Sequence, residues 1–595
     1  MVYVLLDTVY MRISVLFASV IVAGCQVGSG PCQRAAEVVA TCLGIDPPAM
    51  AGACDEPAAQ ALLDQGCAVL SSGKEDGPSL VCRVTGLWCA SSEPTPITDH
   101  RARIAIVGGG PTGLAAAYEL AVLGFGDITL FEANAEVGGK VWTYWHPESG
   151  QPYEVGAIIQ SDSFDNIFRL ARETGYAEEP AEWLKPYPSK ANVIDADGAR
   201  ISSFLDYHQK RPGSSSRYTL FDDAQALPEM ADLILPIGPV SLSGIYTPGF
   251  EDLMVRTGGS SRALRALMQP TDEFMASVPD LVGTSDLSAL RGRFSLFFNM
   301  CGYGFTSEVP ALYHTKFIPM VAKVGVDQVT SWRTSSGIFN ARDGYQRLFI
   351  HLKDWLRARG VKINLGARVE EIERPLGPSS LEWADADEKK TRISYVMASA
   401  QQQEEFDLTI IATPADAARA FLRDATAGER EMFDAVRYYN FVTTIFESDQ
   451  ANMLGRRNGT TFVEDYALDA ATTIAGAHLI GLYNNDGSKV FTAYQFARRD
   501  ATDEEVQAAL RSDLVRLGGS IDKVVLVQQW RNYFPHYDTT TLTAGAGAGQ
   551  SSPFLQRVLA LQGSNRTLFL QAQFDFESTE HMAGFARRTI RRYFQ

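Results

Sequence analysis

Residues 104–114 of this 595-residue chain read IAIVGGGPTGL. The four apolar residues at its start predict a buried strand, and the Ala- and Leu-rich stretch after the glycines predicts a helix. The glycines between them, Gly108, Gly110 and Gly113, have the spacing G-x-G-x-x-G. In such a unit the first glycine permits a tight turn, the second lets the backbone approach a pyrophosphate, and the third permits close helix–strand packing. The stretch therefore predicts a Rossmann-like α/β domain whose helix N-terminus faces the phosphates of a dinucleotide.

An acid follows at the distance that a dinucleotide site requires. The next apolar stretch, residues 127–133, contains Glu132, nineteen residues after Gly113. An acid there is expected to accept a hydrogen bond from a ribose hydroxyl, which favours FAD or NAD over NADP. Pro111 follows Gly110 in the turn and is counted among the expected cofactor-binding residues.

The composition describes an acidic globular chain. Hydrophobic residues make up 46% and charged residues 21% of the sequence, and the formal net charge is -17. The length predicts about two to four domains with sizeable cores. A chain this acidic is not expected to bind a phosphate backbone, so no nucleic-acid partner is predicted. The spacing of Cys and His residues predicts no metal site, and no pattern indicates a catalytic triad.

The N-terminus has the layout of a secretory signal peptide. Arg12 precedes an apolar run over residues 13–22, and small residues follow the run. We therefore expect residues 1–25 to be a signal peptide and the protein to be secreted. Met11 is an alternative start, and the sequence VAGC also fits a lipoprotein cleavage box acylated at Cys25. The apolar run is too short for a comfortable membrane span, and no span is expected elsewhere.

Cysteines crowd the segment behind this signal. The sequence has eight cysteines, and seven of them lie before residue 90. Six lie within residues 26–92 and predict a small disulfide-rich module, formed in an oxidising compartment, whose pairing the sequence leaves open. Residues 93–100 are expected to be a linker, and Cys301 is expected to be a core thiol. The six cysteines of the module are Cys32, Cys42, Cys54, Cys67, Cys82 and Cys89.

Two stretches narrow the cofactor. The chain reads EANAEVGGKVWT from the acid onward and YEVGAI shortly after it. An acid followed by Gly-Gly and a basic residue resembles the flavin amine oxidase superfamily, and this resemblance implies FAD. It also implies that Gly139 and Lys140 approach the FAD diphosphate, and that Gly156 and Ala157 run beside the isoalloxazine ring.

The same resemblance implies that the FAD-binding domain is split in sequence. The stretch GARVEEIER is a predicted strand that would place the backbone of Val369 against the adenine, and FDLTIIATP is a predicted buried strand that returns to the domain. The expected fold is α/β, with a Rossmann-like FAD-binding domain and a mixed α+β substrate domain behind the small module. The FAD-binding parts are expected at 101–170, 331–415 and 541–595, and the substrate domain at 171–330 and 416–540.

Several stretches resemble a narrower group, the FAD-dependent polyenoic fatty acid isomerases. They include GYGFTSEVPALYHTKFI, SWRTSSGIFNARDGYQRLFIHL and QQWRNYFPHYD, in the order of that group. The resemblance implies that flavin N5 takes a hydride from a bis-allylic methylene of a polyunsaturated fatty acid and returns it to another carbon. Such chemistry needs a dry aromatic slot more than it needs acids and bases. The candidate slot residues are Tyr303, Phe305, Trp332, Tyr533 and Phe534.

The chain departs from this family at two places. The last FAD motif normally reads Ala-Gly-Glu or Gly-Asp after a strand, whereas residues 571–573 read QAQ. Gln573 is expected to hydrogen-bond the ribityl chain without charge, and Ala572 adds a methyl group where close approach is expected. The family also implies a basic residue near the substrate carboxylate, for which Lys190 is the candidate.

Three functions compete at this point. The leading expectation is a secreted FAD-dependent isomerase of polyunsaturated fatty acids. An FAD-dependent amine or L-amino-acid oxidase that releases peroxide would share every FAD motif. A non-catalytic flavin-fold scaffold with a binding module would account for Ala572 and Gln573. The expected partner is accordingly a small-molecule unsaturated lipid or amine.

Overall fold

The computed structural model describes residues 34–35, 59–60, 63, 96–161, 164–187, 191–194, 200–201, 262–282, 295–317, 338–375, 390–450, 459–464, 469–484, 487–544 and 553–595. The expected signal peptide, the seven cysteines before residue 90, Trp332 and Lys190 lie outside these ranges. Within them, no helix is long and apolar enough to cross a bilayer.

A five-stranded parallel sheet forms the centre of what we call the parallel-sheet domain. Its order is β10-β2-β1-β14-β20, and each neighbouring pair is parallel. The three inner strands β2, β1 and β14 are buried along their whole length, as expected for continuous apolar runs covered on both faces. The strands are β1 (Ile104–Val107), β2 (Ile128–Glu132), β10 (Lys362–Leu365), β14 (Leu408–Ile411) and β20 (Thr567–Phe569).

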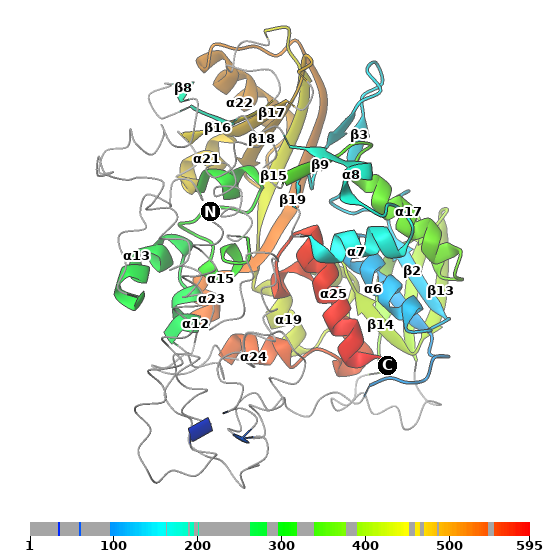
Figure 1. Ribbon diagram of the computed structural model, residues 1–595. Helices are drawn as coiled ribbons and strands as arrows, with labels where there is room; N and C mark the ends of the chain where they lie inside the picture. Colours follow the sequence, from blue (N-terminus) through cyan, green and yellow to red (C-terminus); the bar gives the residue numbers. More distant parts are fainter. Residues whose placement is uncertain are drawn as a thin grey trace.

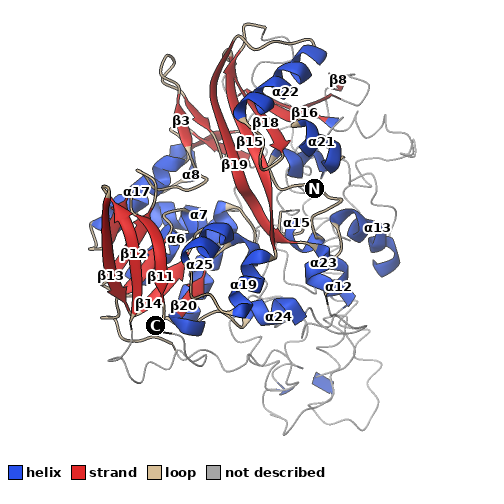
Figure 2. Ribbon diagram, turned by 180° about the vertical axis from the view of Figure 1, so that it is seen from behind, coloured by secondary structure: helices blue, strands red, loops and turns tan. Residues whose placement is uncertain are grey.

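Helices cover one face of this sheet and a second, antiparallel sheet covers the other (Figures 1 and 2). Helix α6 packs against α17 and α25. On the opposite face, the ring of Phe131 in β2 contacts Tyr395 and Phe406 of the three-stranded sheet β11-β12-β13. The helices are α6 (Pro111–Val122), α17 (Gln346–Arg357) and α25 (Thr579–Tyr593), and the strands are β11 (Arg368–Glu373), β12 (Thr391–Met397) and β13 (Ala400–Phe406).

A seven-stranded sheet organises the second domain, in the upper half of Figure 1. Its order is β19-β15-β18-β17-β16-β7-β8, with β16 and β7 parallel and the other pairs antiparallel. Strand β19 is long enough to reach the parallel-sheet domain (Figure 2). The strands are β7 (Ala191–Ile194), β8 (Arg200–Ile201), β15 (Val436–Glu447), β16 (Gly459–Val463), β17 (Leu479–Asn484), β18 (Val490–Ala497) and β19 (Lys523–Tyr537).

The period of two along these strands gives the seven-stranded sheet two different faces. Val442 and Ala493 pack toward the side covered by α21 (Ala470–Gly476) and α22 (Asp503–Arg516). Their neighbours Phe441 and Tyr494 therefore point to the opposite face, which looks toward the parallel-sheet domain. The sheet thus supplies an aromatic wall to the space between the domains.

Helix α25 also contacts α7 (Asp165–Glu173). Glu580 of α25 accepts the backbone N–H groups of Asn166 and Ile167, so α25 caps the first turn of α7. The remaining elements are β3 (Thr143–Trp145), β4 (Pro152–Glu154), β5 (Gln160–Ser161), α7 (Asp165–Glu173), α8 (Pro180–Trp183), β6 (Leu184–Pro186), α12 (Arg262–Leu267), α13 (Thr271–Val282), α15 (Ala311–His314), β9 (Ile338–Ala341), α18 (Ala415–Phe421), α19 (Ala427–Asp434), α23 (Thr539–Thr543), α24 (Pro553–Leu559), and the 3-10 turns η2 (Ser564–Arg566) and η3 (Ala572–Phe574).

Candidate functional site

A cavity of about 1000 Å³ runs between the two domains. Residues at the carboxyl ends of β1 and β2 line what we call its dinucleotide end, and residues of β15, β16, β18 and β19 line what we call its aromatic end. The dinucleotide end lies where ligands bind in open α/β sheets, beyond the carboxyl ends of the parallel strands.

The predicted glycine turn lies at the dinucleotide end. Gly108 has φ +111°, and a Cβ there would stand 2.7 Å from the carbonyl oxygen of Ala412. A Cβ at Gly113 would stand 2.0 Å from the carbonyl oxygen of Gly108. Helix α6 begins at Pro111 with no side-chain cap, so its first N–H groups are free to face a phosphate along the cavity wall.

Glu132 closes the same end of the cavity. One of its oxygens accepts the N–H of Gly109 at 2.7 Å, and the other accepts the N–H of Asn134 at 2.8 Å. These bonds hold the carboxylate against the glycine turn. A carboxylate has further lone pairs, so Glu132 can still accept a ribose hydroxyl.

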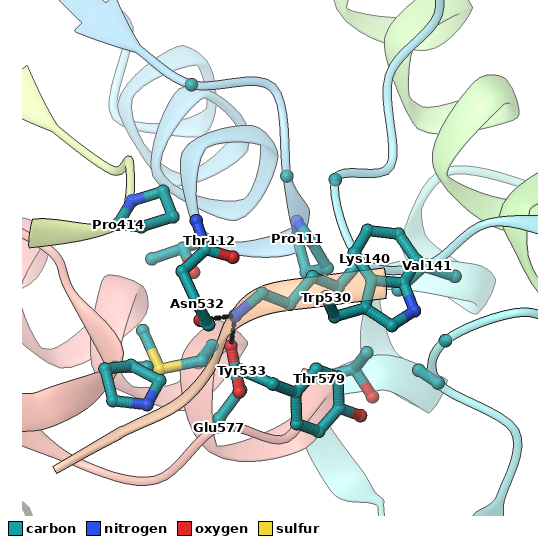
Figure 3. Close-up of a pocket in the computed structure, with 18 of the residues that line it drawn as sticks. Pro111, Thr112, Lys140, Val141, Pro414, Trp530, Asn532, Tyr533, Glu577 and Thr579 are labelled. Carbon is teal, nitrogen blue, oxygen red and sulfur yellow. Dashed lines mark hydrogen bonds and ion pairs between the residues drawn. The ribbon is translucent and has the colours of Figure 1, made fainter. Parts of the chain in front are cut away.

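A second glycine turn meets the first. Gly139 has φ +54°, and a Cβ there would stand 3.2 Å from the Cα of Gly110. Lys140 also lines the cavity, but its ammonium turns toward Glu577 and the carbonyl oxygen of Asn532, which it meets at 2.6 Å (Figure 3). The backbone of this loop thus faces the dinucleotide end, while the charge of Lys140 lies at the junction with the aromatic end.

The other predicted cofactor residues also line the cavity. Val369 lies at the start of β11, next to the dinucleotide end. Gly156 and Ala157 lie where the cavity passes toward the second domain, and the indole of Trp530 donates a hydrogen bond to the carbonyl of Val155 at 3.0 Å.

Aromatic rings form the opposite end of the cavity. The ring centroid of Phe441 lies 5.7 Å from that of Tyr494 and 5.0 Å from that of Tyr533. The ring of Tyr303 lies 4.9 Å from that of Phe317. The described residues of this wall further include Tyr187, Phe297, Met300, Cys301, Thr460 and Phe462.

Two predicted slot residues do not line the cavity. Phe305 is buried among Tyr439 and Phe496, and Phe534 is fully buried behind the wall. The backbone explains both. Tyr303 lies between two glycines with positive φ, which turn its ring inward and leave Phe305 in the core. Phe534 has φ +50°, which breaks the regular alternation of β19 after Tyr533.

The expectation for Gln573 is also corrected. The chain makes the 3-10 turn η3 after β20, and this turn buries Gln573 completely. Its amide donates to the side chain of Gln571 at 2.9 Å instead of lining the cavity. Gln571 and Ala572 line the cavity in its place, and Gln571 donates to the carbonyl of Thr413 at 2.8 Å.

Several residues that line the cavity were not predicted from the sequence. Ser578, Thr579 and Met582 place the N-terminus of α25 at the cavity, so a second helix presents its positive end there. Ser578 precedes a helical pattern and is a favoured N-cap residue, so the start of α25 could have been predicted from the sequence. The sequences of β15 and β18 do not alternate between apolar and polar residues, so they do not show which residues face the cavity.

These features fit a flavin dinucleotide. The glycine positions leave room where a side chain would obstruct the backbone, a helix N-terminus faces the phosphate region, and an acid stands at the ribose position. Among the described residues, no cluster of His, Cys, Asp and Glu could hold a metal ion.

A protein-family model agrees with this geometry. The model for flavin-containing amine oxidoreductases matches residues 111–566. The chain belongs to this family. Its fold is the mixed α/β fold of flavin amine oxidases with a Rossmann-like parallel-sheet core, and its cofactor is FAD.

Relatives of this flavoprotein have several activities. The polyenoic fatty acid isomerase of Ptilota filicina is 22% identical over 305 residues, which cover 47% of this chain and 51% of that protein. The chain therefore spans about half the length of that curated relative. The crystal structure of a CLA-producing fatty acid isomerase from P. acnes has a TM-score of 0.63 at 21% identity and covers 84% of this chain and 100% of the other. A putrescine oxidase structure has a TM-score of 0.52 at 16% identity, with 82% and 98% covered.

Proposed function

We propose that the protein is a secreted FAD-dependent enzyme that isomerises double bonds of polyunsaturated fatty acids. The chemistry of the aromatic end carries this proposal. The charged residues among the described cavity lining are Glu132, Arg368, Glu370 and Arg423 near the dinucleotide end, and Lys140 and Glu577, which pair with each other. An apolar wall without a charge of its own favours a hydrocarbon chain, because an unpaired charge there would lose its hydration.

The protonation states of the tyrosine and cysteine side chains at the aromatic end also fit hydride chemistry. Burial raises the pKa of Tyr303, Tyr494 and Tyr533 well above the usual value for tyrosine. It likewise raises the pKa of the Cys301 thiol. These groups stay protonated and neutral at physiological pH, so they are poor general bases. Bound FAD supplies an acceptor and donor of hydride at N5.

The chain's own residues hold, orient and dry the reacting groups. The glycine turns and α6 would hold the diphosphate, and Glu132 the ribose. The rings of the aromatic end would align an alkyl chain and exclude water, which protects a charged carbon intermediate from hydration. The fatty acid isomerases among the similar proteins support this substrate class.

An amine or L-amino-acid oxidase is the competing outcome. It would share the FAD-binding residues, and the putrescine oxidase fold supports it. A cationic amine gains from an unpaired carboxylate, whereas Glu577 is matched by Lys140 in this cavity. This charge balance favours the lipid.

The test is anaerobic mixing of the purified protein with a fatty acid in which two double bonds flank a methylene. A fatty acid with a single double bond is the control. We expect an ultraviolet band of a conjugated diene to grow with the first substrate while the flavin bands persist. Flavin bands with no diene, together with oxygen uptake on amines or L-amino acids, would replace the isomerase by an oxidase. Purified protein without flavin would favour the scaffold.

Export needs a separate test because it depends on the N-terminal residues. The full chain is expressed in a secreting host, and the N-terminus of the protein in the medium is sequenced. We expect a start near residue 25, as the signal layout predicts. Protein that keeps Met1 and stays in the cells would contradict secretion.

A further inference from the structure

A partly buried ion pair lies at the junction of the dinucleotide end and the aromatic end. The ammonium of Lys140 contacts the carboxylate of Glu577, and the two side chains are 20% and 16% exposed. Both residues line the cavity (Figure 3). Lys140 belongs to the loop of the second glycine turn, and Glu577 precedes α25, so the pair joins segments that are distant in sequence.

The same pair binds the backbone on both sides of Tyr533. Lys140 donates to the carbonyl oxygen of Asn532 at 2.6 Å. The other oxygen of Glu577 accepts the N–H of Phe534. The peptide groups before and after Tyr533 are therefore both held by this ion pair.

The backbone held in this way is strained. Phe534 has φ +50°, in the left-handed region that is unfavourable for a residue with a Cβ. Such a conformation persists when surrounding contacts determine it, and it occurs often at functional sites. Its consequence here is that Tyr533 faces the cavity while Phe534 packs into the core.

The Tyr533 ring fills a tightly limited position. The Lys140 ammonium lies 5.1 Å from its centroid, and the Phe441 ring lies 5.0 Å away on the aromatic wall. Gly302 also packs against the ring: a Cβ at this position would stand 2.5 Å from it, so there is no space between Gly302 and Tyr533 for a side chain. A shift of the ring would therefore change the width of the cavity at the junction.

We propose that the Lys140–Glu577 pair is a positioning device that holds the turn at Asn532–Phe534 and so fixes the Tyr533 ring as the wall between the two ends of the cavity. The pair acts through Tyr533 and not on the substrate itself. The ring then sets how far a substrate chain reaches past the junction. This last consequence rests on the proposed function, whereas the placement of the ring does not.

The placement is tested by fluorine NMR of the FAD-saturated protein with 3-fluorotyrosine at position 533. The variants are Glu577→Gln, Lys140→Met and the double variant. The control is Glu431→Gln, which removes a carboxylate from the surface pair with Arg557. We expect a shifted or broadened resonance in both single variants, no further change in the double variant, and none in the control. FAD content is measured in each sample.

The double variant keeps the test decisive. A single substitution leaves an unpaired, partly buried charge and can unfold the protein, whereas removing both partners avoids that cost. An unchanged resonance in the folded double variant would overturn the proposal. Loss of folded protein in all three variants would overturn it too, because the pair would then hold the fold and not a ring.

The substrate arm is separate. With any unsaturated fatty acid that the wild-type protein converts, the double variant is expected to change the ratio of product positional isomers at least twofold. A moved resonance with no turnover in the wild type would keep the positioning role and reject the proposed function. A moved resonance with an unchanged isomer ratio would reject the ring's role in selecting the reacting carbon.

Discussion

The Cα of Gly156 lies against the carbonyl of Lys140 so closely that a Cβ at position 156 would stand 1.8 Å from its oxygen. The next residue fixes this approach, because the N–H of Ala157 donates to the same oxygen at 3.1 Å. The segments around Lys140 and Gly156 both line the cavity, and they can pack this closely only because residue 156 has no side chain.

Gly156→Ala is therefore expected to push these two segments apart and to lower the FAD content of the purified protein at least tenfold. The flavin absorbance per polypeptide measures this loss. The control is Gly126→Ala, since a Cβ at Gly126 meets nothing within 4 Å. Full FAD content in the Gly156 variant would mean that the cofactor does not depend on this contact.

Glu132→Gln is expected to weaken FAD binding about 10- to 100-fold. The carboxylate accepts N–H groups from Gly109 and Asn134 on separate oxygens, and an amide can accept on one of its two terminal atoms. The hydrogen bond that a ribose hydroxyl would make to this charged carboxylate is worth about 1.5–3 kcal/mol, and the neutral amide loses much of it. Titration of the apoprotein with FAD gives the change in Kd. The control is Glu136→Gln, which removes the same charge from a pair with Lys353 outside the cavity lining.

The dinucleotide end could be predicted because the residues that define it lie close together in sequence. Gly108, Gly110 and Gly113 lie within one short stretch of sequence, and each role depends on the missing Cβ. Glu132 follows one strand later and bonds back to that turn. A motif of this length carries its own geometry, so it indicates a Rossmann-like fold and a dinucleotide. The choice of FAD over NAD came from the resemblance to the flavin amine oxidase superfamily.

The aromatic end could not be predicted in the same way. Tyr533 and Phe534 are adjacent aromatic residues, and the left-handed backbone at Phe534 decides which of them reaches the cavity. Phe441 and Tyr494 face the cavity because of the order of strands in the sheet, which no short stretch encodes. Glu577 acquires its role through a lysine 437 residues away. Long-range pairing and local strain set this part of the site.

Gly304→Ala is expected to destabilise the wall that carries Tyr303. Gly304 has φ +74°, and a Cβ there would stand 2.1 Å from the ring of Tyr439. The left-handed backbone costs about 1–2 kcal/mol, and the forced overlap adds about 1–3 kcal/mol. Gly360→Ala isolates the first effect, because Gly360 has φ +88° and its Cβ would meet nothing within 4 Å. Urea unfolding of both variants should show the larger loss at Gly304. Equal losses would show that the Tyr439 ring moves aside without cost.

The stability of the fold should fall as the pH is lowered, and His314 should carry part of this fall. Its ring is fully buried between Thr271, 2.8 Å from Nδ1, and the carbonyl of Tyr303, 2.7 Å from Nε2. Burial lowers the pKa of His314 to about 3, from 6.5 in the unfolded chain. Between these values the unfolded chain binds a proton that the folded protein does not. Stability is therefore complete above pH 6.5 and is lost as the pH falls toward 3.

The measurement is the free energy of unfolding at several pH values between 6.5 and 4.5 for wild type and His314→Gln. One such group contributes a slope of about 1.4 kcal/mol per pH unit, so the variant should be less stable at neutral pH but less sensitive to acid by that slope. His536 and His581, whose pKa values burial lowers to about 4 and about 3, keep a slope of the same sign in the variant. Parallel curves for the two proteins would show that His314 is protonated in the fold, and that the bond to the Tyr303 carbonyl does not depend on a neutral ring.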